Sequence, residues 1–540
     1  MIARVVDNPW ARRLWPWTPL LLAAVWLVAL AVDFRAVVQT IYANADFVSA
    51  PVIGELYDER APGAQVVLGN FPWYETLWFE RLTAGLPAHR QIWQLAPWLF
   101  SLLGIAATAW ATWRAAGRWA AMVVAVALGC AGPALLIFQF GGSLHGPTFT
   151  HIALLGAFLV LCATHGGRVG NWWTHVALCA LLAALTASGL ASDKLLAPGG
   201  IAPFVLAAVA LLFLLPGQAG RRIAISAVAI SAVAGVGARI LSDAMKGDHV
   251  VAAHFEVLFA SFDRLLPNLR LLAHSLIFMF NGDFGGDRLG VRAILELACA
   301  AAVLAGAWYA IKVGRDWVRG ARPSRAEDPA TAALYAHLAF WILAGVLLGA
   351  TFVLSSVPAD QNSARYVLSV GYAVVVLVAI AAASRPRARA FVVVGLSLVL
   401  VSGIRGFVRG DIQDNPSQFP TGDISGPLER LAAAERVEHG YAGYWTAAAL
   451  TWQTKAAVKV YPVKSCTGGP TLCPYTLHRI SSWYDPRPAT RSLLVIDPAQ
   501  LSAGGPRETD PAFGAPERVS RIGRTTVYVY GYDIAAKFAR

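Results

Sequence analysis

The sequence predicts a polytopic α-helical membrane protein that carries a small α/β domain at its C-terminal end. The chain has 540 residues, of which 57% are hydrophobic and only 14% charged, and its mean hydropathy is +0.54. A soluble fold needs more charge on its surface than this. The net charge of +12 comes mainly from short Lys and Arg clusters between apolar runs, where such residues orient helices, so it does not indicate a nucleic-acid partner.

Long apolar runs give the number of spans. Runs of about 18 or more mainly apolar residues predict about eleven transmembrane helices. The first run is longer than a signal-peptide core, so we expect an uncleaved helix. The approximate limits of the runs are 15–38, 93–113, 119–140, 148–165, 172–190, 198–215, 222–242, 290–312, 331–356, 364–383 and 390–408.

The charges between these runs predict the orientation. With eleven spans, the basic clusters all fall in alternate loops, which is the excess expected of cytoplasmic loops. We therefore expect a plasma-membrane protein with its N-terminus inside and its C-terminus outside. The clusters are Arg12 and Arg13; Arg114 and Arg118; Arg168; Arg221 and Arg222; Lys312, Arg315, Arg319, Arg322 and Arg325; and Arg385, Arg387 and Arg389.

The sequence divides into two predicted domains. Residues 1–408 form the transmembrane domain with long outer loops at 39–92 and 243–289, and residues 409–540 form an extracytoplasmic α/β domain. The second loop is apolar at spacings of three and four, which indicates one or two helices lying in the membrane interface. In the C-terminal domain, the pattern predicts helices at 427–440 and 444–454 and strands at 457–463, 492–497 and 525–532.

The first outer loop concentrates carboxylates. Asp46 comes soon after the first span, at the boundary between water and membrane, where it can accept a proton from an attacking hydroxyl group. An alternative is a solvated Asp46 that caps a helix in SAPVIGELY. Asp33, near the outer end of the first span, and the pair Asp58 and Glu59 are other candidates for the acid.

Three cations at predicted outer helix ends are suited to a phosphate group. They are Lys194, which follows Asp193, and also Arg365 and Arg288. Each can instead extend along the bundle toward water or pair with a neighbouring acid. His145 lies near another outer junction and is a candidate for hydrogen bonding to phosphate or sugar, or for a satisfied polar residue within the bundle.

Two cysteines differ from the rest. Cys466 and Cys473 lie close together in the polar C-terminal part, and a disulfide between them needs an oxidising compartment. For metal binding, the chain has no tight ligand spacing such as His-Glu-x-x-His.

The layout resembles the membrane glycosyltransferases of the GT-C superfamily, which include the protein O-mannosyltransferases and the lipid A aminoarabinose transferase. The shared features are a large first outer loop with an acid soon after the first helix, many further spans and a C-terminal outer domain. Three short stretches match in residues: NADF around Asp46, SDKL from Ser192 to Leu195, and SARY from Ser363 to Tyr366.

The resemblance implies a polyprenyl-phosphate sugar donor, an inverting transfer on the outer face, and a glycan, lipid or protein of the cell envelope as acceptor. It makes Asp46 the base and places Lys194 and Arg365 at the donor phosphate, with Asp193, Arg288, His145 and Tyr366 also at the substrate. Family members have an acidic pair directly after the first helix, whereas Asp46 stands alone. This departure leaves metal dependence open, with a divalent ion as an option.

Two other function classes remain open. One is a transporter or flippase of lipid-linked saccharides, which more often has internal repeats and charges near the membrane midplane. The sequence has no evident repeat and few ionisable residues in its spans. The other is a non-catalytic envelope assembly protein, for which substitution of Asp46 would have no effect.

Overall fold

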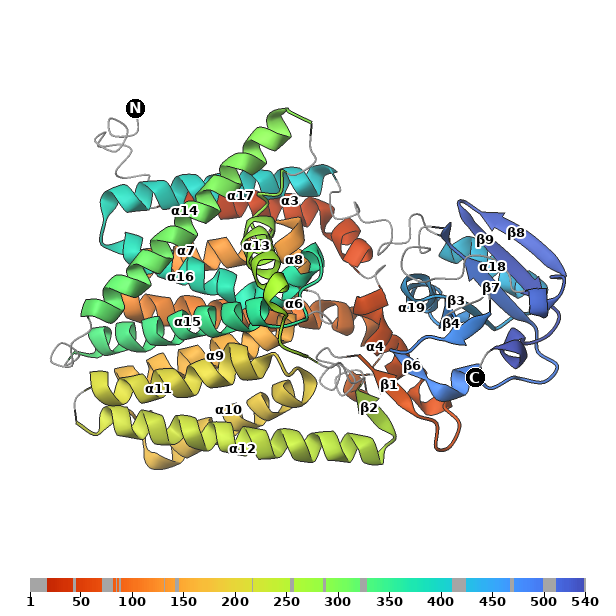
Figure 1. Cartoon of the computed structure of the whole chain (residues 1–540), viewed down its shortest axis with the longest axis horizontal. Coiled ribbons are helices and arrows are strands. Elements are labelled where there is room, and N and C mark those ends of the chain that lie inside the picture. The colour runs from red at the N-terminus through yellow and green to blue at the C-terminus, as the bar shows by residue number, and fades with distance from the viewer. Residues whose placement is uncertain are drawn as a thin grey trace. The chain divides into compact units, whose positions relative to one another are not determined.

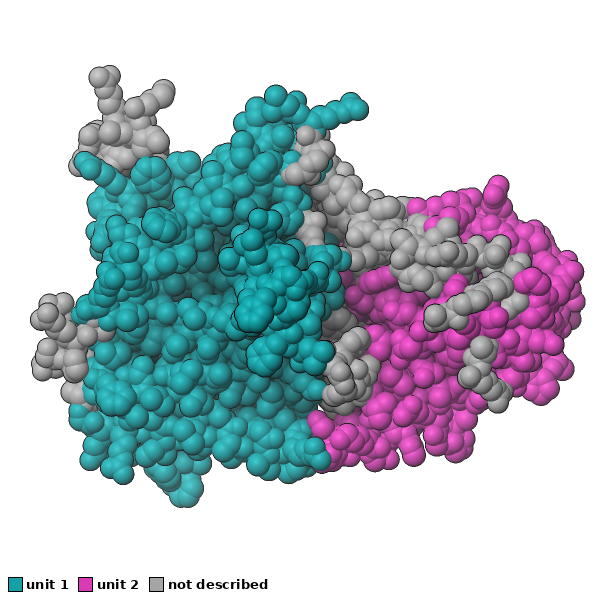
Figure 2. Space-filling view, in the orientation of Figure 1, with its two compact units in different colours: residues 1–34, 96–241, 256–411 teal, residues 35–95, 242–255, 412–540 magenta. Residues whose placement is uncertain are grey.

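A computed structural model covers the chain as two compact units (Figures 1 and 2). The first unit comprises Met1–Phe34, Ala96–Leu241 and Glu256–Asp411, and the second comprises Arg35–Leu95, Ser242–Phe255 and Ile412–Arg540. The structure describes residues 17–41, 45–69, 81–83, 85–86, 89–130, 132–140, 145–215, 217–252, 257–284, 288–320, 328–409, 424–466, 471–498 and 511–538.

Long helices account for the first unit (Figure 1). They are α3 (Thr18–Ile41), α6 (His89–Ala116), α7 (Arg118–Gly129), α8 (Pro133–Phe140), α9 (Gly146–Thr164), α10 (Trp172–Ser192), α11 (Ala202–Leu214), α12 (Ala219–Gly247), α13 (Phe262–Met279), α14 (Val291–Gly320), α15 (Pro329–Leu354), α16 (Leu368–Ala383) and α17 (Pro386–Arg409). A π-helical turn (Ala197–Ile201) precedes α11, and a 3-10 helix (Gln361–Val367) precedes α16.

The multi-pass helical class is confirmed. Within the described ranges, nine helices are long and apolar enough to cross a membrane, and two shorter apolar helices, Leu20–Val32 and Arg118–Gly129, fall in the first and third predicted spans. The third predicted span, 119–140, is interrupted between α7 and α8, where Gly132 and Pro133 follow each other. The count of eleven and the orientation stay predictions.

Helix α15 is the central element of the first unit. It packs against α9, α11 and α16, and side chains such as Phe340 and Trp341 are buried at these contacts. Helix α10 comes close to α9 at Gly189, where an added Cβ would lie 2.7 Å from Cδ2 of His151. A glycine is therefore required at this crossing, as is common where membrane helices pack closely.

The second predicted outer loop contains a helix, α13. Apolar side chains before and on this helix are exposed, with Phe259 89%, Phe262 92% and Leu266 55% accessible. Such a surface is typical of a helix that contacts lipid at the membrane interface. Its position in the interface stays a prediction.

The second unit contains two sheets. Its elements are α4 (Ala45–Glu55), β1 (Val66–Leu68), β2 (Val250–Ala252), α18 (Ser425–Glu435), β3 (His439–Gly443), α19 (Tyr444–Gln453), β4 (Lys459–Ser465), β5 (Leu472–Pro474), β6 (Arg479–Ile480), β7 (Ser492–Ile496), β8 (Arg518–Ile522) and β9 (Thr525–Tyr530). Short 3-10 helices lie at Tyr57–Glu59, Ser481–Tyr484, Pro511–Phe513 and Ile534–Lys537.

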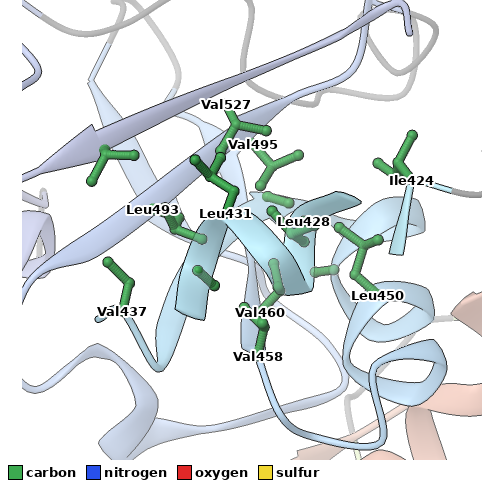
Figure 3. Packing of buried hydrophobic residues seen from close by; sticks show 14 residues of the cluster. Ile424, Leu428, Leu431, Val437, Leu450, Val458, Val460, Leu493, Val495 and Val527 are labelled. Carbon is green, nitrogen blue, oxygen red and sulfur yellow. The ribbon is translucent and has the colours of Figure 1, made fainter. Parts of the chain in front are cut away.

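The larger sheet has the strand order β5-β4-β3-β7-β9-β8, with β3 parallel to both β4 and β7. One face carries an apolar core with α18 and α19 (Figure 3). The core includes Leu428, Leu431, Leu450, Val460, Leu493, Val495 and Val527.

All three predicted strands and both predicted helices of the C-terminal domain are confirmed. The strands are β4, β7 and β9, and the helices are α18 and α19. Strand β3 corrects the prediction of a helix at 427–440, because His439 and Gly440 belong to the strand. Gly440 allows close contact there, since an added Cβ would lie 2.8 Å from the Cβ of Leu493.

The smaller sheet joins segments far apart in the sequence. Strand β1 pairs in parallel with β2 and antiparallel with β6. The backbone N–H of Ser481 also donates to the carbonyl of Gln65 at 2.8 Å, and Arg90 donates to the carbonyl of Trp452 at 2.6 Å. The first outer loop and the C-terminal segment thus belong to one compact unit.

Candidate functional site

Asp46 lies in the first turn of α4 and is only 7% exposed. An acid in this turn interacts favourably with the positive end of the helix dipole. Residues Ala45 to Ile53 are all buried, because α4 packs against α19. The carboxylate is therefore not the solvated loop side chain of the alternative interpretation.

Tyr444, the first residue of α19, holds this carboxylate. Its hydroxyl donates a hydrogen bond of 2.7 Å to Oδ1 of Asp46. The Tyr444 ring stacks on Tyr475 with centroids 4.6 Å apart and planes 12° apart, and it also contacts His478 at 5.4 Å. We call Asp46, Tyr444, Tyr475 and His478 the acid–tyrosine cluster.

Burial sets the protonation states in this cluster. Burial, together with the charge of Asp46, raises the pKa of Tyr444 well above its usual value. The same two causes raise the pKa of Tyr475 to about 12. Burial lowers the pKa of His478 to about 3. At neutral pH both phenols keep their protons and His478 is neutral, so Tyr444 can only donate to a carboxylate.

The other candidate acids differ from Asp46. Asp58 is exposed, and Glu59 forms an ion pair of 2.6 Å with Lys459 at the surface. The side chain of Asp33 lies outside the described residues. Asp46 thus differs from Asp58 and Glu59 in two ways: its carboxylate is buried, and it accepts a hydrogen bond from a buried phenol.

A second polar cluster lies in the first unit, where α9 begins and α10 ends. Nδ1 of His145 and the hydroxyl of Thr148 each contact Oδ2 of Asp193 at 2.5 Å. His145 and Asp193 are each only 3% exposed. Because an ionised carboxylate can only accept, Nδ1 of His145 carries the proton.

Burial of Asp193 opposes its ionisation, but the charge of His145 and the hydrogen bonds from His145, Thr148 and the Leu195 amide outweigh it and lower the pKa of the carboxyl. Asp193 is thus an anion at neutral pH. His145 itself has a left-handed backbone, with φ of 40°. Such a conformation is uncommon outside glycine and often occurs at functional sites.

Tyr366 and Arg365 complete the second cluster. The rings of His145 and Tyr366 are 5.0 Å apart. Nη2 of Arg365 donates to the Tyr366 hydroxyl at 3.1 Å. The cluster therefore joins residues from the start of α9, the end of α10 and the 3-10 helix Gln361–Val367. We call His145, Thr148, Asp193, Arg365 and Tyr366 the histidine–aspartate cluster.

The remaining predicted cations are at the surface. Lys194 and Arg288 are exposed, and among the described residues neither side chain has a hydrogen-bond or ion-pair partner. Lys194 is adjacent in sequence to Asp193. Arg288 lies in the segment between α13 and α14 and has no described contact with the histidine–aspartate cluster.

Asp46 belongs to the second unit, and the histidine–aspartate cluster belongs to the first. The convergence of Asp46, Lys194 and Arg365 on one cavity stays a prediction. In the described part of the chain, no group of three or more His, Cys, Asp or Glu residues is arranged to hold a metal ion. Cys466 and Cys473 are joined by a disulfide.

Sequence reasoning missed Thr148, Tyr444, Tyr475 and His478. Thr148 could have been found, because it follows His145 by three residues and so lies on the same side of a helix. The other three carry no comparable signal.

The chain is similar to two crystal structures of ArnT from Cupriavidus metallidurans. With the apo structure it shares 14% sequence identity and a TM-score of 0.46, over 96% of this chain and 100% of that chain. With the structure bound to undecaprenyl phosphate it shares 15% identity and a TM-score of 0.45, over 94% and 97%. No family model matches the chain, and no curated protein matches it.

Proposed function

We propose that this protein is a membrane glycosyltransferase that moves a sugar from a polyprenyl-phosphate donor to an acceptor of the cell envelope. The observation that carries the proposal is the buried, hydrogen-bonded carboxylate of Asp46, at the position where the resembling enzymes carry their base. The multi-pass helical fold supports it, because a polyprenyl donor needs a lipid-facing site.

In the proposed reaction, Asp46 accepts the proton of the acceptor hydroxyl as its oxygen attacks the anomeric carbon. The bond between this carbon and the phosphate oxygen breaks, and the polyprenyl phosphate leaves with the electron pair. The attack comes from the side opposite the phosphate, which gives inversion.

The donor phosphate is proposed to bind at the histidine–aspartate cluster and the neighbouring cation Lys194. Arg365 presents a planar guanidinium group, which suits phosphate oxygens. The exposed ammonium group of Lys194 has no carboxylate partner among the described residues and adds a second positive charge. Asp193 holds the His145 ring through Nδ1 and fixes its orientation. Arg288 is proposed as an outlying contact to the donor.

The test uses purified protein in proteoliposomes with a panel of polyprenyl-phosphate sugars and measures release of polyprenyl phosphate. We expect Asp46→Asn to lower turnover by about 100- to 10,000-fold, the range for loss of a general base. Asp58→Asn is the matched control, because Asp58 is an exposed carboxylate of the same loop. Full turnover in Asp46→Asn would remove the base from the mechanism.

A second arm tests the transporter alternative. A fluorescent lipid-linked sugar is followed between the two leaflets in the same proteoliposomes. We expect no protein-dependent movement. Movement without release of polyprenyl phosphate would contradict the transferase and support a flippase.

A further inference from the structure

Tyr444, in the C-terminal segment, contacts the Asp46 carboxylate directly. Its hydroxyl donates to Oδ1 of Asp46 at 2.7 Å, and both side chains are buried, with Tyr444 6% exposed. The two residues are separated by 398 positions in sequence. A buried carboxylate without a hydrogen-bond donor is strongly disfavoured, so this contact favours the charged form of Asp46.

The phenol is itself held in place. Its ring stacks on Tyr475 and contacts Trp445 at 5.0 Å and His478 at 5.4 Å. Tyr444 lies at the start of α19, directly after strand β3, so its backbone is fixed by the larger sheet. The hydroxyl therefore meets the carboxylate from a fixed direction.

We propose that Tyr444 is a positioning residue that orients the Asp46 carboxylate and keeps it ionised, so that the C-terminal segment completes the reactive centre. The inference rests on the proposed function, in which Asp46 is the base.

The groups around the carboxylate determine the form of the test. The charge of Asp46 acts on Tyr444 from α19 and on Tyr475 from the segment after β5, and neutral His478 contacts the Tyr444 ring. Glu55, at the other end of α4, is paired with Arg90 at 2.6 Å. Loss of the Tyr444 hydroxyl should therefore change the ionisation of Asp46 more than that of Glu55.

The experiment compares Tyr444→Phe with the matched control Tyr441→Phe, which also loses one phenol hydroxyl that donates to a buried carboxylate, that of Asp533 at 2.8 Å in the same unit. In Tyr444→Phe we expect kcat to fall about tenfold, the KM for the donor to stay unchanged, and the acidic limb of the pH–rate profile to move up by about one pH unit. In Tyr441→Phe we expect the profile of the unmodified protein.

A second variant strengthens the same hydrogen bond without removing it. Incorporation of 3-fluorotyrosine at position 444 gives a more acidic phenol, which is a stronger donor, and should move the acidic limb to lower pH. An unchanged acidic limb and kcat in both variants, with Asp46→Asn inactive, would overturn the positioning role.

An activity-independent readout separates this inference from the proposed function. The carboxyl infrared band of Asp46, identified by its loss in Asp46→Asn, is titrated in the unmodified protein and in Tyr444→Phe. We expect it to titrate about one pH unit higher in Tyr444→Phe. If the band does not move, the inference fails. If Asp46→Asn remains active while the band moves, the proposed base fails and the hydrogen bond stands.

Discussion

Two buried aspartates are held in different ways in the two units. Asp193 is bonded to His145 and Thr148, which lie on or beside the neighbouring helix and only 48 and 45 residues away in sequence. Asp46 is bonded to the neutral phenol of Tyr444, 398 residues away. The first acid thus has an ionisable partner close in sequence, and the second a neutral partner from the other end of the chain. The two clusters should respond differently to mutation and to pH.

The largest effect is expected from Asp193→Ala. Removing one member of a buried ionisable pair costs about 3 kcal/mol or more, because the other member loses its partner. Unfolding in detergent by denaturant titration measures the loss. Asp316→Ala is the control, since Asp316 pairs with Arg315 at the surface and is 54% exposed. Equal losses for both variants would contradict the stabilising role of the buried pair.

The next effect depends on pH and concerns His478. Its pKa is about 3 in the folded chain and near 6.5 when unfolded, so the unfolded state binds more protons between these values. Stability is then complete above pH 6.5 and falls as the pH drops toward 3, by about 2 kcal/mol at pH 5. His478→Asn should remove this dependence, and Asn tolerates the left-handed φ of 51°. Unfolding measured from pH 7 to 5 checks it, with the exposed His165→Asn as control. If the unfolding free energy of His478→Asn keeps the full pH dependence, that dependence comes from other groups.

Tyr444→Phe should cost less than Asp193→Ala. Loss of one hydrogen bond to a buried carboxylate costs about 1.5 kcal/mol. The change in unfolding free energy is compared with that of Tyr475→Phe, which should be smaller. If Tyr444→Phe lowers the unfolding free energy as much as Asp193→Ala does, the contacts of the two acids stabilise the fold equally, and the difference between the two clusters does not hold.

The smallest effect is expected from Glu59→Gln. Its ion pair with Lys459 joins the first loop to β4, but the Glu59 side chain is 53% exposed. Such pairs contribute about 0.5 kcal/mol and are screened by salt. At low salt the unfolding free energy of Glu59→Gln should be slightly below that of the unmodified protein. At high salt this difference should disappear. A loss of unfolding free energy above about 1 kcal/mol at either salt concentration would mean that this surface ion pair stabilises the fold more than expected.

The sequence predicts helices better than contacts. Apolar runs identify α9, α10 and α15 because a membrane span needs about 20 apolar residues, and this requirement is local. A short apolar run likewise identifies β7, and alternation identifies β9. Strand β3 is missed because HGYAG contains two glycines and no alternating pattern, and its pairing with β4 and β7 gives it its conformation.

For the candidate site too, single residues could be predicted from the sequence but their contacts could not. His145, Asp193 and Arg365 could be selected individually, since polar residues at helix ends are rare in an apolar chain. That His145 and Asp193 share a hydrogen bond depends on the close contact between α9 and α10, which Gly189 permits. Tyr444 could not be selected, because a tyrosine in an amphipathic helix gives no sign of a partner near the N-terminus.

The hydrogen bond between Asp46 and Tyr444 joins a residue that is synthesised early to one that is synthesised much later. A ribosome adds about 5–20 residues per second, so on the order of 20–80 s pass between the synthesis of Asp46 and that of Tyr444. Throughout that interval the nascent loop carries a carboxylate whose phenol has not yet been made. Premature release of the polypeptide before α19 would leave α4 without the helix against which it packs.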